Sequence, residues 1–400
     1  MAHERSHWLN PLRTELWSAR WIFLATLALY IAIFSRRVLL DITAQVQTIT
    51  KVCAGEVALP PTFMFYGATW LSALGQCNFT LLMGAAALVC AGFISAKWWV
   101  SKKILLQALA LQDKQEIRKA AWLAAMLGLL ASFPTADWPR YGYYLSGAPT
   151  PNYWMNGTLL ASWPFALMLF WESAQQLERV RAGWVWRMLL WILLLLVSKP
   201  SYLFVFALVY PPMLLLRHGW HNRAVWIQFA GLAATATLLL LEYWLVFRQP
   251  DSVYVRDFNK GQASGVVLAP FFVWRHYTGN IAIAVLSAIV FPVSVLIAWW
   301  HLALKHLLLR YAWAGFGVAL LISATFMQTG EEYLAWNFRW QHYLASYILF
   351  LSSAVFAWQQ WRAQAYRKDL KIKWISAIFA LHLLSGILYL GKMWWTKLYY

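Results

Sequence analysis

The sequence is poor in charge, and above all in negative charge. Only 12% of its 400 residues are charged, and 15 Asp and Glu stand against 33 Lys and Arg. Soluble domains carry about 25% charged residues, so this scarcity excludes an ordinary soluble enzyme. Hydrophobic residues make up 62% of the chain. We therefore predict an all-α integral membrane protein, in which residues 1–400 form a single polytopic transmembrane domain.

Cysteine is scarce as well. The three cysteines, Cys53, Cys77 and Cys90, show none of the spacings that are typical of zinc sites. Cys77 and Cys90 lie in apolar sequence, where a free thiol behaves as a small hydrophobic side chain. We accordingly expect no disulfide framework and no structural zinc.

The net charge of +18 has to be interpreted together with the apolar runs. Most cations lie in short connections between these runs, and such positive charge marks the cytoplasmic side of a membrane. Nucleic-acid binding would need a basic face on a soluble fold, so we exclude nucleic acid as a partner. The first strongly basic connection contains Lys97, Lys102, Lys103, Lys114, Arg118 and Lys119.

Placing every basic connection in the cytoplasm predicts about 11–12 transmembrane helices and a cytoplasmic N-terminus. Residues 62–97 are too many for one span and too few for three, so we expect 62–75 to form a short interfacial or re-entrant helix. We place an active-site cavity on the extracytoplasmic face. The outer loops then comprise about residues 41–61, 135–158, 248–278 and 328–341.

Charge first returns after the first apolar run, at Arg36, Arg37 and Asp41. A carboxylate just past a membrane helix, with cations about one turn away, suits a reaction at the membrane surface on a charged lipid substrate. A general base must be a carboxylate or a histidine. Asp41 is therefore the candidate base.

Cations on the outer side are exceptions to the charge rule. Arginine binds phosphate through two parallel hydrogen bonds, so Arg36, Arg37, Arg275 and Arg339 are candidate phosphate ligands. Lys199 precedes Pro200 between two short apolar runs. This pattern predicts a broken helix pair that faces a cavity, with Glu242 as a candidate counter-ion of the lysine.

Four stretches, in this order, carry a family resemblance. They are Asp41 followed by Gly55, Pro60-Pro61 and Phe65-Tyr66; GAPTPNYWMNGT at 147–158; Ser198-Lys199-Pro200-Ser201; and GEEYLAWNFRWQ at 330–341. Together they resemble the GT-C superfamily of polytopic glycosyltransferases, which use polyprenyl-phosphate sugars. The sequence departs from that pattern at Met155, where a His is expected near Trp154 and Asn156.

The resemblance implies an inverting transfer of a sugar from a polyprenyl-phosphate donor to a glycan or glycolipid acceptor. It implies Asp41 as the catalytic base and Lys199 with the outer arginines as donor-phosphate ligands. Some members use a divalent cation and others do not, so the resemblance assigns no certain cofactor. The resemblance implies a protein of the bacterial inner (plasma) membrane, with membrane lipid as a partner. The implied sugar or acceptor ligands are Asn152, Trp154, Asn156, Glu331, Glu332, Asn337 and His342.

Two alternatives stay open. A polysaccharide (O-antigen) polymerase or ligase acting on undecaprenyl-diphosphate glycans also has 11–12 helices, and it relies on Arg and His without an early Asp. A transporter or flippase would show inverted repeats with paired interrupted helices. No such repeat is evident in the sequence, which makes the transporter the weaker alternative.

Overall fold

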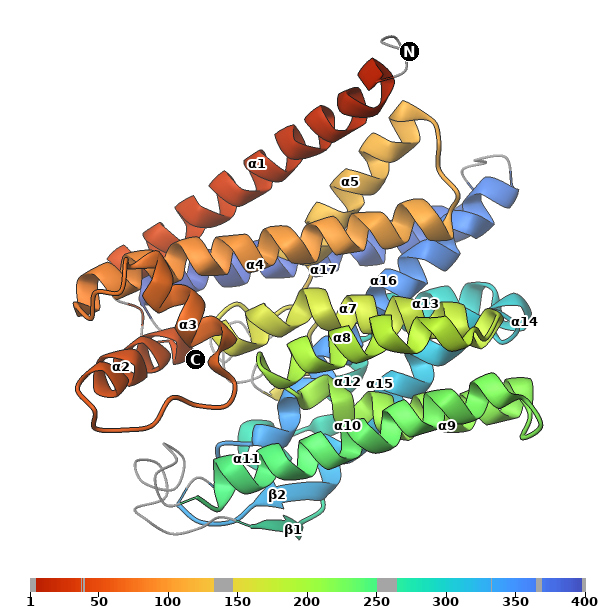
Figure 1. Cartoon of the computed structure of the whole chain (residues 1–400). Coiled ribbons are helices and arrows are strands. Elements are labelled where there is room, and N and C mark those ends of the chain that lie inside the picture. Colours follow the sequence, from red (N-terminus) through yellow and green to blue (C-terminus); the bar gives the residue numbers. More distant parts are fainter. Residues whose placement is uncertain are drawn as a thin grey trace.

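Helices dominate the structure, which is a computed structural model of the chain (Figure 1). It describes residues 5–36, 38, 40–132, 147–249, 265–331, 333–364 and 369–397, with the backbone alone for 5–18 and 246–247. Helix accounts for 78% of the structure. The helices of the first part are α1 (Arg5–Ser35), α2 (Asp41–Cys53), α3 (Phe63–Ser72), α4 (Phe79–Ala108), α5 (Lys114–Leu129), α7 (Gly157–Glu178), η2 (Ala182–Trp184), α8 (Val185–Leu196), α9 (Ser201–His218) and α10 (Arg223–Phe247).

The later part adds a small antiparallel sheet beside further helices. Its two strands pair Val266 with Gln328 and Leu268 with Phe326. The elements are β1 (Val266–Leu268), α11 (Phe272–Tyr277), α12 (Ile281–Ala288), α13 (Val290–Ala298), α14 (Trp300–Ala303), α15 (Leu307–Thr325), β2 (Phe326–Gln328), η4 (Asn337–Arg339), α16 (Trp340–Ala363) and α17 (Leu370–Thr396).

Five of the described helices are long and apolar enough to cross a membrane: α4, α9, α10, α15 and α17. The pair α12 and α13, bent by 63°, forms a sixth candidate. Helices α7 and α16 are also long, at 22 and 24 residues, and both are buried along most of their length. These features confirm the expected helical membrane protein. The expected 11–12 crossings stay a prediction.

The loops gather at two opposite ends of the bundle. At the basic end, Arg362 donates to the carbonyl of Leu109 (2.6 Å) and Arg217 to that of Leu177 (3.2 Å). At the other end, the Ile42 amide donates to the carbonyl of Met155 (3.1 Å). Each of these three contacts joins two segments that are expected on the same side of the membrane. The sidedness itself stays a prediction.

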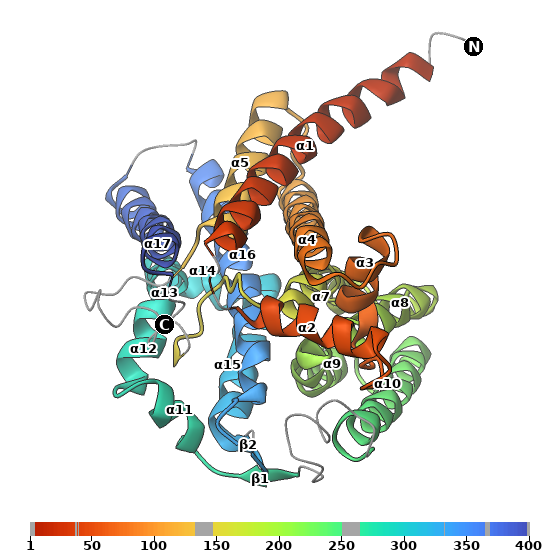
Figure 2. The ribbon, with the colours of Figure 1, turned by 90° about the vertical axis from the view of Figure 1, so that its left-hand side faces the viewer.

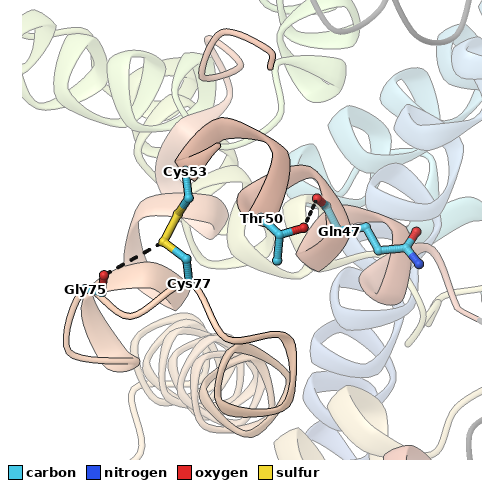
Figure 3. The surroundings of a disulfide bond; sticks show 5 residues. All are labelled: Gln47, Thr50, Cys53, Gly75 and Cys77. Carbon is cyan, nitrogen blue, oxygen red and sulfur yellow. Dashed lines mark hydrogen bonds between the residues drawn. A yellow bond between two sulfur atoms is a disulfide. The ribbon is translucent and has the colours of Figure 1, made fainter. Parts of the chain in front are cut away.

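Helices α2 and α3 lie together at the end of the bundle opposite the basic loops (Figures 1 and 2). Cys53, at the end of α2, forms a disulfide with Cys77 in the loop before α4 (Figure 3). The expectation of unpaired cysteines is therefore wrong for two of the three, while Cys90 is free and buried. Disulfides persist in oxidising compartments, so this bond favours an extracytoplasmic position for this end.

The disulfide also bears on the short helix α3. Its 10 residues extend only about 15 Å at about 1.5 Å per residue, half of the hydrocarbon core. The covalent bond keeps the chain before α3 and the chain after it at the same end of the bundle. This agrees with the expectation that residues 62–75 do not cross the membrane.

One part of the expected basic connection is not a loop. Helix α4 continues through Lys97 to Ala108, and Lys97 is only 2% exposed. Its Nζ donates to Asn152 Oδ1 (2.5 Å) and the carbonyl of Gly128 (3.5 Å), and it lies 3.8 Å from the ring centroids of Trp163 and Tyr347. Lys97 is therefore an interior cation with a complete set of partners, and its placement in a solvated connection is wrong.

The disulfide provides a direct test of sidedness. After mild reduction of intact cells, we expect a membrane-impermeant maleimide to label Cys53 and Cys77, because both residues are exposed. Cys90 is 0% exposed and should stay unlabelled, which makes it an internal control. A Cys53→Ser/Cys77→Ser variant should lose the signal. Labelling that appears only after permeabilisation would place this end in the cytoplasm and contradict the expectation.

Candidate functional site

Asp41 is positioned by the first turn of α2 and by the loop before α7. The backbone amide of Ile42 donates to the carbonyl of Met155 (3.1 Å), which fixes α2 against that loop. The Asp41 carboxylate then accepts a hydrogen bond from Asn156 Nδ2 (3.0 Å). Because Asp41 lies in the first turn of α2, the helix dipole also favours its negative charge.

Asn156 joins this carboxylate to the start of α7. Its Oδ1 accepts from the Leu159 amide (2.9 Å), the usual hydrogen bond of a helix N-cap. The same oxygen accepts from Thr158 Oγ1 (2.8 Å). Gln45, one turn after Asp41 on α2, accepts from the Gly157 amide (2.9 Å). Asp41 and Gln45 of α2 are therefore hydrogen-bonded to the start of α7.

Lys199 lies at the apex of the hairpin formed by α8 and α9. The break falls where Pro200 ends the first helix, as the sequence predicts. Its Nζ donates to Thr158 Oγ1 (3.2 Å) and lies 4.4 Å from the ring centroid of Trp340. Burial lowers the pKa of Lys199 to about 8; Asp41 and Glu242 raise it, and Arg339 lowers it. Lys199 and Glu242 form no salt bridge within 4.0 Å among the described residues, so their pairing stays a prediction.

Arg339 is the least satisfied cation of the site. It is 5% exposed, and its guanidinium lies 4.7 to 5.7 Å from the ring centroids of Trp340, Tyr277 and Tyr153. The one hydrogen bond of the guanidinium to a described residue is a long one, from Nη2 to Tyr153 Oη (3.5 Å). Nε and Nη1 are buried and have no hydrogen-bond partner there. An anion would satisfy both donors.

These residues form a continuous series of contacts. It runs from Asp41 through Asn156 and Thr158 to Lys199, and from there over Trp340 to Arg339. Helix α2 lies across this end of the bundle, in front of α7 and α9 (Figure 2). The structure therefore brings together one carboxylate, one amide and two cations from segments far apart in the sequence.

Other predicted site residues serve packing. Asn152 is 1% exposed; its amide donates to the carbonyls of Leu127 and Ala131 (both 2.7 Å) and accepts from Lys97. Trp154 is 2% exposed and stacks on Tyr389. Both side chains are enclosed in the core, so they do not present the hydroxyl-binding groups expected of them.

Two further predicted residues, Asn337 and His342, lie in the segment that contains Arg339. Asn337 donates to Gln328 (2.6 Å) and accepts from Trp340 Nε1 (3.3 Å). His342 is fully buried; its Nδ1 contacts Ser323 Oγ (3.4 Å), and its Nε2 has no hydrogen-bond partner among the described residues. These two residues support the Arg339 region and do not contact Asp41.

The remaining predicted residues lie elsewhere. Arg36 packs over the ring of Trp394 at 4.5 Å, against the end of α17. Arg275 and Glu331 are exposed. Arg37 and Glu332 lie outside the described residues.

Two contributors were not predicted, although one left a signal. Gln45 follows Asp41 by four residues, the spacing that places side chains on one helix face. The aromatic rings around Arg339 left no such signal, because the abundance of Trp and Tyr suits interfacial anchoring equally well. In the part of the chain that the structure describes, no three His, Cys, Asp or Glu side chains group so as to hold a metal ion. We therefore assign no residue to a metal.

Neither a protein-family model, nor a curated protein, nor a solved structure matches this chain. The function is therefore inferred from the geometry of the site.

Gly157 allows α3 to pack against the start of α7. A Cβ at this position would lie 2.4 Å from the ring of Phe65, which is itself fully buried. We expect Gly157→Ala to destabilise the protein by about 1–3 kcal/mol through overpacking, measured as thermal unfolding in detergent.

The matched control is Gly84→Ala on α4, where an added Cβ meets nothing within 4 Å. It should be neutral or slightly stabilising. The double variant Phe65→Leu/Gly157→Ala should recover part of the loss, because leucine leaves more room. Equal stability of Gly157→Ala and the wild type would contradict the tight contact.

Proposed function

We propose that the protein is an inverting glycosyltransferase that moves a sugar from a polyprenyl-phosphate donor to a lipid-linked or surface glycan acceptor. The observation that carries this proposal is the series of contacts from Asp41 to Arg339. It combines a carboxylate that can accept a proton with two cations, the half-buried Lys199 and the buried Arg339, neither of which forms a salt bridge with a described carboxylate. A membrane enzyme of this class needs these two functions at one end of its helix bundle.

In this mechanism the acceptor hydroxyl attacks the anomeric carbon of the donor sugar. A new carbon–oxygen bond forms on one face while the bond to the phosphate oxygen breaks on the other. The hydroxyl proton passes to the Asp41 carboxylate, and the electron pair of the broken bond leaves with the phosphate. Lys199 and Arg339 stabilise the charge that develops on this leaving group.

Asn156 holds the base in place for this step. Its Nδ2 donates to one Asp41 oxygen, Oδ2, which leaves Oδ1 as the site for the acceptor hydroxyl. The aromatic rings of Tyr153, Tyr277 and Trp340 around Arg339 exclude water, which strengthens the electrostatic attraction to phosphate. They also disfavour hydrolysis of the donor.

The membrane arrangement that we propose has the Asp41 end on the extracytoplasmic face. In this arrangement the chain would pass between the two ends eleven times, so that successive loops lie at alternate ends. The passes would be α1, α4, α5, α7, α8, α9, α10, the pair α12 and α13, α15, α16 and α17. The Cys53–Cys77 disulfide at the Asp41 end supports this orientation. A bacterial inner membrane is the setting that a polyprenyl-phosphate donor favours.

A polysaccharide polymerase or ligase is the second candidate. One observation favours it: Arg339 and His342 both carry buried nitrogens without hydrogen-bond partners among the described residues, and that chemistry relies on Arg and His. The two functions differ in their dependence on Asp41, so its substitution separates them.

We expect Asp41→Asn to lower kcat for sugar transfer by at least about 100-fold, because the amide cannot accept the hydroxyl proton. Donor affinity should stay within about threefold, since the cations remain. Lys199→Ala should instead weaken donor binding by about tenfold or more. The measurement is transfer by the purified chain from a synthetic polyprenyl-phosphate sugar.

Glu56→Gln is the control for Asp41→Asn, because Glu56 is an exposed carboxylate that follows the same helix. It should leave transfer unchanged. Normal turnover by Asp41→Asn would refute the assignment of the base. If that variant were active and unpolymerised repeat units accumulated only in the gene deletion, the polymerase would be the better proposal.

Donor affinity should depend on pH through Lys199. Its pKa of about 8 means that the ammonium is charged below pH 8 and neutral above it, and phosphate binds the charged form. We therefore expect donor affinity to fall as pH rises above 8, by up to about tenfold per pH unit. Equilibrium binding at pH 7, 8, 9 and 10 measures this. Lys199→Arg stays charged over this range and should flatten the profile; the same slope in both proteins would contradict the role of Lys199.

A further inference from the structure

A cavity with three charged side chains in a largely apolar wall lies between α4, α7 and α8. Its volume is about 290 Å³, and its lining includes Trp99, Lys103, Phe165, Glu172, Arg187 and Trp191. Glu172 follows Thr158 by 14 residues on the same helix, which corresponds to about 21 Å at about 1.5 Å per residue. The cavity therefore lies toward the basic end of the bundle and is separate from the candidate active site.

The cavity contains buried polar atoms that lack hydrogen-bond partners among the described residues. Glu172 is 6% exposed, and its Oε2 accepts no hydrogen bond. The nearest cation, Arg187 Nη1, is 3.7 Å away and pairs with it only electrostatically. The indole Nε1 of Trp191 is also buried without a partner. One acceptor and one donor are thus left unsatisfied in the wall of the cavity.

The charges around these atoms have a defined order. Glu172 lies in the buried wall, whereas the Arg187 side chain is 61% exposed. Lys103, half-buried on α4, lies 5.5 Å from the ring centroid of Trp99. A ligand that enters from the surface therefore meets two cations first and a carboxylate deeper inside.

The level of the cavity along the bundle indicates the source of the ligand. Adjacent to Glu172, Trp171 Nε1 donates to Gln107 Oε1 (2.7 Å) near the end of α4. Exposed Trp186 lies in the first turn of α8, next to Arg187, and tryptophan is enriched where a helix passes the lipid headgroups. A headgroup at this level can reach the cavity from the side.

We propose that this cavity binds the headgroup of a phospholipid with a primary amine, of the phosphatidylethanolamine type. The ammonium donates to Glu172 Oε2, and the phosphate accepts from Lys103, Arg187 and Trp191 Nε1. This ligand supplies the hydrogen-bond donor that Glu172 Oε2 lacks and the acceptor that Trp191 Nε1 lacks. An anionic lipid without an amine, such as phosphatidylglycerol, offers the carboxylate only neutral hydroxyl donors, which bind it more weakly than an ammonium, and a choline headgroup has no N–H to donate.

Native mass spectrometry of the full chain in detergent, with added dioleoyl lipids, tests this assignment. We expect phosphatidylethanolamine to bind about tenfold or more tightly than phosphatidylcholine, as expected for a charge-assisted hydrogen bond. Glu172→Gln should remove this preference. Arg187→Gln should weaken phosphatidylethanolamine and phosphatidylglycerol alike, because it acts on the phosphate.

Glu178→Gln is the matched control, since Glu178 is the exposed last residue of the same helix; it should leave lipid binding unchanged. If Glu172→Gln did not fold, stepwise N-methylation of the lipid would replace it, and affinity for the wild type should fall as N–H groups are lost. A preference that survives in Glu172→Gln, or equal affinity of the wild type for phosphatidylglycerol and phosphatidylethanolamine, would overturn the proposal.

Discussion

The Asn156 side chain is the contact on which the candidate site depends. One end of its amide caps α7, and the other end donates to the Asp41 carboxylate. Helix α7 is buried along nearly its whole length, so its capped start is a fixed point in the bundle. Asp41 lies at the beginning of a short amphipathic helix that has little core of its own. Its position is therefore set by the central helix to which Asn156 connects it.

Lys97 and Arg339, two buried cations with aromatic neighbours, differ in how their charge is stabilised. Lys97 has an amide oxygen, a carbonyl and two ring faces around its Nζ. Arg339 has rings but only one long hydrogen bond, and two of its nitrogens lack partners among the described residues. A buried charge is costly unless it is paired and hydrogen-bonded. This contrast favours a structural role for Lys97 and a ligand-binding role for Arg339.

The sequence predicted the features that depend on local composition. Hydropathy and proline position indicated the helical class, the short helix before α4 and the break at Lys199-Pro200. It did not predict features that depend on distant parts of the fold. The Cys53–Cys77 disulfide requires α2 and the loop after α3 to meet, and the burial of Lys97 requires Asn152 to arrive from the loop before α7. Asn152 and Asn156 belong to the same sequence motif, and the sequence offers no reason to assign them different roles. Only Asn156 contacts Asp41 in the structure.

The two ends of the helix bundle differ in how their cations are placed. Basic side chains concentrate at the end that carries Glu172, as expected for the cytoplasmic side. Lys199 and Arg339 lie at the opposite end, which we propose to be extracytoplasmic and where the charge rule disfavours cations; the described carboxylates that act on Lys199 there are Asp41 and Glu242. Desolvating a cation without a matched anion is unfavourable, so two cations retained there indicate that an external anion completes the site. In the proposed function a lipid-linked phosphate would reach this end from within the membrane, which is the physical reason for proposing a polyprenyl-phosphate donor and not a soluble one.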